Sequence, residues 1–431
     1  MKEKYDFRIK NRAKYTIPPY DQENLEYIKS EIASGKTIDE IEISPNLSFS
    51  YAGFTTLNIL EASIIHNHNH TTEYLIGLGA HNIFNVQSEL LAYCINSNFD
   101  EIVNIILTRS DLNPNYALKD GITPLLAACS NDDIGLIQIL LDKGADIDAS
   151  DTRGMGVLLR ACYSAHAKES TEIVDFLIAR GADIIKTSEN GHNLLMAAIY
   201  SCNQILINKI LDLYTTHNFD DYIWAANDEG ASSLMLASRT GNLETVKLLI
   251  QKGLNIYDID KKGENTLMYA CESGSEELID YIVSLYSNPQ KDLSIKNYNG
   301  RDVFLKACEK GNINIIQKLI DLGANPFTED NYHNNAVIQA ARFNNFEAIE
   351  LLESYGVNLD HRNKGGTSAL MVIARFGDGE DTKVQEFIKF LLDHGVDTSF
   401  INQNIEPIEP ENSIENVIEE NTELQGDNTE F

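Results

Sequence analysis

The chain has 431 residues, 43% of them apolar, enough for a substantial core in several domains or in one long repeat array. Asp and Glu number 65 against 34 Lys and Arg, so a net charge of −31 disfavours binding to nucleic acid and anionic membranes. No stretch approaches the roughly 18 apolar residues of a membrane-spanning helix, and no apolar core follows the basic N-terminal residues as in a secretory signal.

The N-terminal segment raises the question of a nucleotide site. Residues 1–20 form a basic arm, and a helical pattern over 22–33 precedes the sequence SGKT, which matches the end of a phosphate-binding loop. Such a loop needs a glycine where this chain has Ser30, and it opens a helix instead of following one. We therefore predict that Gly35 ends a helix and that residues 21–50 form an N-terminal capping half-repeat, without a cofactor.

A histidine cluster follows. His66, His68 and His70 alternate in HNHNH, and in an extended segment two of them would face the same way, as a metal site requires. The cluster falls, however, in a polar turn between two predicted helices. We interpret it as a solvated loop and predict no metal site there.

From residue 51 onwards the chain repeats itself. Residues 119–149 contain a turn glycine, an apolar helix, a polar turn, a second apolar helix and the sequence GADIDA, and the same order recurs in 228–256 and 298–325. The turn positions of ten such units are Gly53, Val86, Gly121, Gly154, Gly191, Gly230, Gly263, Gly300, His333 and Gly366. Five of the nine intervals are 33 residues long, and a period of this size indicates a repeat array.

These units resemble the ankyrin repeat, a turn followed by two antiparallel helices. The fragment TPL at 123–125 retains part of the family signature, whereas Val86 and His333 replace the turn glycine. The resemblance implies an all-α solenoid over residues 51–400, with the turns projecting as fingers beside the first helices. It also implies that the concave face of fingers and first helices binds other proteins, without catalysis in the repeats.

Five cysteines share one register in the predicted first helices: Cys94, Cys129, Cys162, Cys271 and Cys308. Equivalent helices of adjacent repeats pack about 8–10 Å apart, too far for the Cα separation of about 5.5–6 Å in a disulfide. We predict small buried core residues in a reducing compartment, and therefore a cytoplasmic protein. Cys202 is off this register, and no partnered base marks a thiol as a nucleophile.

The last three repeats concentrate cations and aromatic side chains at positions that the family exposes. These residues are Lys296, Tyr298, Arg301 and Lys310 in the eighth repeat, Tyr332, Arg342 and Phe343 in the ninth, and Arg362, Lys364, Arg375 and Phe376 in the tenth. Arg and Tyr often anchor protein interfaces. We predict that repeats eight to ten bind a protein partner with an acidic surface. In the alternative, the rings pack between repeats and the charges are solvated.

A second stripe, made of Trp224, Tyr257 and Phe327, lies six residues before three of the turn positions. These rings are either further partner contacts or packing against the neighbouring finger. The sequence GDGED at 377–381 suggests a calcium loop, but the EF-hand spacing and its closing Glu are absent. We predict an insertion loop there.

Residues 401–431 have nine acidic residues, no basic residue and two prolines, the composition of a disordered segment. Three interpretations remain open. The segment is a solubilising tail, or it folds back onto the basic face of repeats eight to ten, or it is an address. Glutamate-rich C-terminal tails resemble the translocation signals of effectors that intracellular bacteria inject through type IV secretion systems, which would place the protein in a host cytosol.

Together these patterns predict a monomeric, non-catalytic scaffold without cofactor, metal or membrane segment, for which nucleic acid is a disfavoured ligand. The alternative is an adaptor or enzyme-like effector whose activity lies in residues 1–50, with the repeats as its targeting module. Fifty residues are too few for an independent catalytic core.

Overall fold

The protein is helical, as predicted, in the residues that the structure describes. The computed structural model describes residues 19–36, 63, 71, 74–75, 90–98, 100–108, 112–165, 171–376 and 382–397. The chain divides into two compact units, Met1–Ser164 with Glu172–Ile184, and Ala165–Thr171 with Ile185–Phe431.

The first unit contains one early helix and a short array of helical hairpins. Its helices are α2 (Pro19–Ala33), α5 (Leu90–Asn96), α6 (Asp100–Leu107), α7 (Pro124–Ser130), α8 (Ile134–Asp142), α9 (Val157–Ser164) and α10 (Glu172–Ala179). Helix α7 packs against both α5 and α9, and each of these three helices pairs with the one that follows it. Gly35, with φ +95°, follows the end of α2, so Ser34 and Gly35 lie in a turn after a helix, as predicted.

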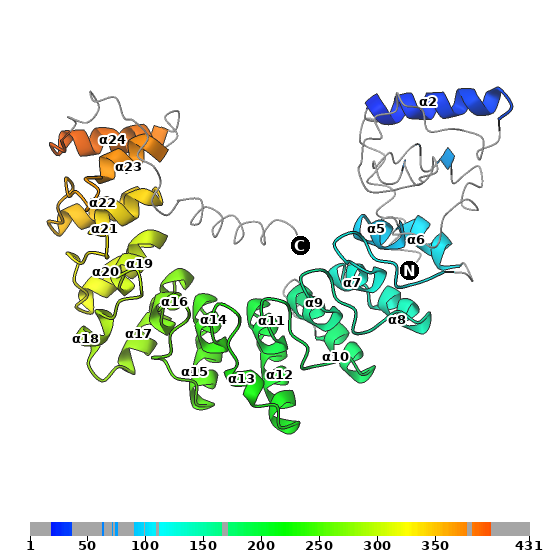
Figure 1. Ribbon diagram of the computed structural model, residues 1–431, viewed down its shortest axis with the longest axis horizontal. Helices are drawn as coiled ribbons and strands as arrows, with labels where there is room; N and C mark the ends of the chain where they lie inside the picture. Colours follow the sequence, from blue (N-terminus) through cyan, green and yellow to red (C-terminus); the bar gives the residue numbers. More distant parts are fainter. Residues whose placement is uncertain are drawn as a thin grey trace. The chain divides into compact units, whose positions relative to one another are not determined.

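The second unit stacks its helical hairpins in chain order, from α11 in green to α24 in orange (Figure 1). Its first helices are α11 (Leu194–Tyr200), α14 (Ser233–Arg239), α16 (Thr266–Ser273), α19 (Val303–Lys310), α21 (Ala336–Arg342) and α23 (Ala369–Phe376). Its second helices are α12 (Gln204–Thr216), α15 (Leu243–Gln251), α17 (Glu276–Ser284), α20 (Ile313–Asp321), α22 (Phe346–Ser354) and α24 (Thr382–Asp393). Short helices α13 (Asp221–Trp224) and α18 (Pro289–Leu293) follow α12 and α17.

Local sequence explains where the first helices begin. The side chains of Asn193, Ser232, Asn265, Asp302 and Asn335 each accept a hydrogen bond from the backbone N–H three residues later, as N-caps do. The helices that follow are buried almost all round, because they are covered by neighbouring repeats and by their own second helices. Each second helix instead buries one stripe, such as Val246 and Leu249 in α15.

The prediction that five cysteines are buried core residues is confirmed. Cys94, Cys129, Cys162, Cys271 and Cys308 are buried and free, all in first helices. Burial raises the pKa of the Cys129 thiol to about 12, so it is protonated at neutral pH. Cys202 is exposed and has φ +53° in the turn between α11 and α12.

Candidate protein-interaction face

A row of backbone hydrogen bonds joins the fingers of the second unit. In each bond, the N–H two residues before one turn position donates to the carbonyl one residue before the preceding turn position. The bonds are Asp228 to Asn190 (3.0 Å), Lys261 to Glu229 (2.8 Å), Tyr298 to Lys262 (3.0 Å), Asn331 to Asn299 (3.0 Å) and Lys364 to Tyr332 (3.0 Å). This ladder fixes the order and spacing of the fingertips.

The turn positions need a left-handed backbone and, in most repeats, no side chain. Gly300 has φ +78°, and a Cβ atom there would lie 2.6 Å from the backbone nitrogen of Asn331 in the next finger. Glycine avoids both the conformational strain and the clash. His333 nevertheless adopts φ +59° at its turn position, so losing the glycine has not changed the finger.

Two of the predicted aromatic residues lie at the fingertips. Tyr298 is 66% exposed and Tyr332 is 54% exposed. The ammonium groups of Lys296 and Lys364 donate to backbone carbonyls of the ninth finger, at Glu329 (2.5 Å) and Asn331 (2.6 Å). The structure therefore brings these four predicted residues together on the finger row.

Three of the other predicted cations, Lys310, Arg342 and Arg375, lie in the last turns of first helices. The residues nine positions after the turns form one column, which we call the helix-end column: Tyr200, Arg239, Glu272, Glu309, Arg342 and Arg375. From the sequence we chose Lys310 in the eighth repeat, but Glu309 occupies the equivalent position. Lys310 pairs with Glu272 (3.3 Å), and Arg301 pairs with Glu309 (2.7 Å).

Arg342 differs from these paired cations. Its side chain is exposed and makes no hydrogen bond or ion pair within the described part of the chain. Desolvation by the surrounding protein, and then the charge of Arg301, lower the pKa of Arg342. The charges of Asp330 and Glu309 oppose this lowering of the pKa.

The remaining predicted residues of the tenth repeat and its neighbour are spread more widely. Arg362 pairs with Asp397 (2.7 Å), and Arg375 is exposed at the end of α23. Phe343 is half-buried where α21 ends. The side chain of Phe376 lies outside the described residues.

A buried ion-pair network supports the face from beneath. Lys306 on α19 pairs with Glu264 (3.0 Å) and Glu309 (3.4 Å), and Asn297 donates to Glu264 (3.1 Å). Burial alone would lower the pKa of Lys306, but the two carboxylates outweigh it and raise the pKa. Burial alone would likewise raise the pKa of Glu264, but Lys306 lowers it.

A second polar pattern links three fingers to their own first helices. In these fingers, an Asp three residues before the turn accepts a hydrogen bond from a donor six residues after it. Tyr269 Oη donates to Asp260 (2.9 Å) and Gln339 Nε2 donates to Asp330 (2.7 Å) in the second unit. Arg160 donates to Asp151 (2.7 Å) in the first unit.

In earlier first helices of the second unit, a cation contacts aromatic rings where Lys306 contacts carboxylates. The guanidinium of Arg239 lies 5.2 Å from the ring centroid of Tyr200 and 5.9 Å from that of Tyr269. It also donates to the Tyr200 hydroxyl. His192 stacks on the other side of this group, 5.6 Å from Tyr200 between ring centroids.

The second stripe lies at the ends of the second helices, away from the fingertips. Trp224 Nε1 donates to the carbonyl of Lys252 (3.2 Å), and Tyr257 stacks on Tyr286 at 5.5 Å between centroids. Trp224, Tyr257 and Phe327 remain 53%, 41% and 58% exposed. Two of the three rings thus contact segments that follow second helices, and all three keep exposed surface.

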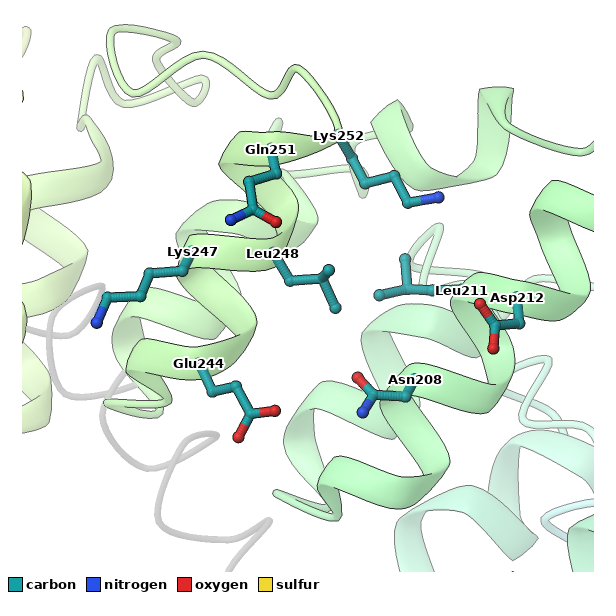
Figure 2. A pocket seen from close by; sticks show the side chains of 8 residues that line it. All are labelled: Asn208, Leu211, Asp212, Glu244, Lys247, Leu248, Gln251 and Lys252. Atoms are coloured by element: carbon teal, nitrogen blue, oxygen red, sulfur yellow. The ribbon is translucent and has the colours of Figure 1, made fainter.

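A groove between the second helices α12 and α15 is a separate feature. Figure 2 shows Leu211 and Leu248 pointing toward each other across it, with polar side chains around them. Its charged residues, Asp212, Glu244, Lys247 and Lys252, balance one another. No catalytic constellation is apparent among them.

Within the described ranges, no helix has both the length and the apolarity to cross a membrane. Among these same residues, no three His, Cys, Asp or Glu side chains are grouped as metal ligands. The HNHNH histidines and the GDGED loop, for which we predicted no metal site, lie outside the described residues.

Comparison with known families identifies the repeats. The family profile "Ankyrin repeats (3 copies)" matches residues 90–188, 125–222, 158–258, 194–297, 284–363 and 304–402. Because these matches cover well over half of the sequence, the chain belongs to the ankyrin-repeat family. This confirms the predicted all-α solenoid and implies a role in protein–protein interaction.

Individual relatives are similar over a shorter stretch. The chain is 39% identical over 56 residues to protein phosphatase 1 regulatory subunit 27 from Homo sapiens, and equally so to the same protein from Mus musculus. The match covers 13% of this chain and 36% of each relative.

Proposed function

We propose that this protein is a non-catalytic scaffold that holds an acidic partner protein on the finger face of repeats eight to ten. The observation that carries the proposal is Arg342, an exposed cation beside Arg301 in a protein of strongly negative net charge. The fingertip rings of Tyr298 and Tyr332 supply exposed aromatic surface in the same repeats. Such a combination suits a partner that has carboxylates and apolar groups together.

The relatives support a binding role at a coarser level. Their name describes a regulatory subunit of a phosphatase. Within this chain we assign the role of first contact to Arg342 and Arg375, and that of the aromatic anchor to Tyr298 and Tyr332.

Quantitative affinity capture from a eukaryotic cytosolic lysate tests the proposal. The baits are the wild-type chain, the Arg342→Glu/Arg375→Glu variant and a Lys318→Glu variant. Lys318 lies on the second helix α20 and pairs with Asp280 (2.7 Å), so it controls for charge reversal away from the face. We expect a partner that is captured by wild type and Lys318→Glu and lost with the double variant. A partner that all three baits retain would contradict the assigned face and direct attention to Trp224, Tyr257 and Phe327.

Two finer hypotheses stay predictions. An effector that acts on a host protein would need residues 401–431 as its export signal, so a reporter fused to them should be translocated by a type IV secretion system. An adaptor function in residues 1–50 would instead be lost on deletion of residues 1–20 while the repeats still bind their partner. Both segments lie largely outside the described residues.

A further inference from the structure

The fingertips of the second unit divide into an acidic half and a basic half. In every repeat from five to ten, the two residues before the turn position are exposed. In repeats five and six they are Glu189, Asn190, Asp228 and Glu229. In repeats seven to ten they are Lys261, Lys262, Tyr298, Asn299, Asn331, Tyr332, Lys364 and Gly365. The first group contains no base and the second contains no acid, so charge changes sign along one row.

Backbone hydrogen bonds between fingers fix the spacing of the basic half. We call Lys261, Lys262, Tyr298, Tyr332 and Lys364 the basic strip. The backbone ladder runs through all of its fingers, from Lys261 to Lys364. Glu329, a half-buried carboxylate near this row, lies 3.4 Å from a ring nitrogen of His333 and 3.6 Å from one of His361. The strip is therefore a line of cations and phenol rings, which fits an extended acidic segment that also carries apolar side chains.

We propose that the basic strip binds residues 401–431 of this same chain. Seven of their nine acidic residues are interleaved with Ile, Val and Leu in the sequence IEPIEPENSIENVIEENTEL, a mixture that a strip of Lys and Tyr side chains would recognise. Pro407 and Pro410 oppose a helix and favour an extended backbone at the start of the segment.

The segment is also near enough and long enough. It begins four residues after Asp397, which pairs with Arg362 in the tenth repeat. An extended chain spans about 3.3–3.6 Å per residue, so the segment reaches about 100 Å. Four stacked repeats at about 8–10 Å spacing require only about 40 Å. If the finger face also binds a partner, this segment is a competitor built into the chain, but its docking does not depend on that partner.

Fluorescence anisotropy with a fluorescein-labelled synthetic peptide of residues 401–431 tests the proposal. One protein is the full wild-type chain. The other is the full chain with the acidic residues of the segment replaced by their amides, namely Glu406, Glu409, Glu411, Glu415, Glu419, Glu420, Glu423, Asp427 and Glu430. We expect the peptide to bind the amide variant at least about tenfold more tightly, because the wild-type strip is already occupied at high effective concentration. The affinity should fall as salt rises.

Two fingertip variants, made in the amide background, locate the site. Lys261→Gln/Lys262→Gln should weaken peptide binding by about fivefold, the size expected for two exposed ion pairs. Glu189→Gln/Glu229→Gln changes the same number of charges in the acidic half and should not weaken it. Absence of peptide binding to the amide variant, equal binding to both full chains, or indifference to the lysine change would each overturn the proposal.

Two further measurements distinguish this proposal from nucleic-acid binding and from the proposed partner binding. A labelled oligothymidylate that binds more tightly than the peptide would reassign the strip to single-stranded nucleic acid, which also favours bases with aromatic rings. Loss of peptide binding together with intact, Arg342-dependent partner capture would overturn the docking of residues 401–431 alone. The reverse result would remove the proposed function and leave the docking in place.

Discussion

Two stretches of the first helices in the second unit accommodate the charges of Lys and Arg side chains in different ways. From α11 to α16, the charge of Arg239 lies between the rings of Tyr200 and Tyr269. From α16 to α21, Lys306 and Arg301 are instead matched to Glu264 and Glu309 at 2.7–3.0 Å.

The difference separates stability from recognition. A cation between rings is shielded without counter-charge, so it responds weakly to pH and salt. A buried ion pair depends on every member, because the loss of one leaves its partner desolvated and unpaired. Beyond the ion pairs, Arg342 is exposed and makes no ion pair within the described residues, so its guanidinium remains available to a partner.

The largest expected effect comes from breaking the ion-pair network. Lys306→Met should destabilise the protein by about 3 kcal/mol, because Glu264 would stay buried without its cation and Glu309 would keep only Arg301. Urea denaturation followed by circular dichroism measures the midpoint. The triple variant that also carries Glu264→Gln and Glu309→Gln should recover part of the loss. Lys318→Met, which removes a more exposed lysine from a similar pair, should change the midpoint much less. Equal effects of Lys306→Met and Lys318→Met would refute the network.

Acid should weaken the ion-paired stretch before the aromatic one. The pKa of Glu264 is lower in the folded protein than its ordinary value of 4.5, so its contribution is complete above pH 4.5 and is lost as the pH falls through the folded value. Hydrogen exchange should therefore accelerate in α19 before it does in α14. A Glu264→Gln variant should show less of this pH dependence, and identical profiles for variant and wild type would count against the assignment.

A smaller effect is expected in the aromatic stretch. Arg239→Met keeps most of the side-chain volume but removes the cation between Tyr200 and Tyr269, at a cost of about 1 kcal/mol. Because the rings do not titrate near neutrality, this loss should be the same from about pH 5 to about pH 8. A loss that varied strongly over this range would show that the stretch behaves like the ion pairs.

The smallest effect on stability is predicted for Arg342. Arg342→Gln removes an exposed side chain without an ion pair and relieves its repulsion with Arg301, so the free energy of unfolding should change by less than about 0.5 kcal/mol. Thermal unfolding of the two proteins in parallel measures this. A clear destabilisation would mean that Arg342 has a structural role.

Sequence periodicity was sufficient for the fold, because the repeat fixes the order of turns, helices and buried cysteines. It even located the fingertips that carry Tyr298 and Tyr332. The pairing of Asp260 with Tyr269 and of Asp330 with Gln339 could also have been predicted from the sequence. An Asp before the turn occurs with a donor on the helix, whereas Asn227 occurs with the apolar Leu236.

The charge balance of the face was harder to predict. Counting cations at a few positions per repeat omitted Glu309 and Glu272, which neutralise Arg301 and Lys310. Whether a charge is paired depends on which side chains of adjacent repeats meet, and insertions of unequal length between the repeats obscure that register. The network around Lys306 was missed for this reason.

Partner capture by the Arg342→Gln variant is the most direct test of the separation between stability and recognition. We expect this variant to unfold at the wild-type midpoint and to capture much less of the partner from the same lysate. Full capture at an unchanged midpoint would contradict the central claim, because the exposed cation of the ninth repeat would then contribute nothing to binding.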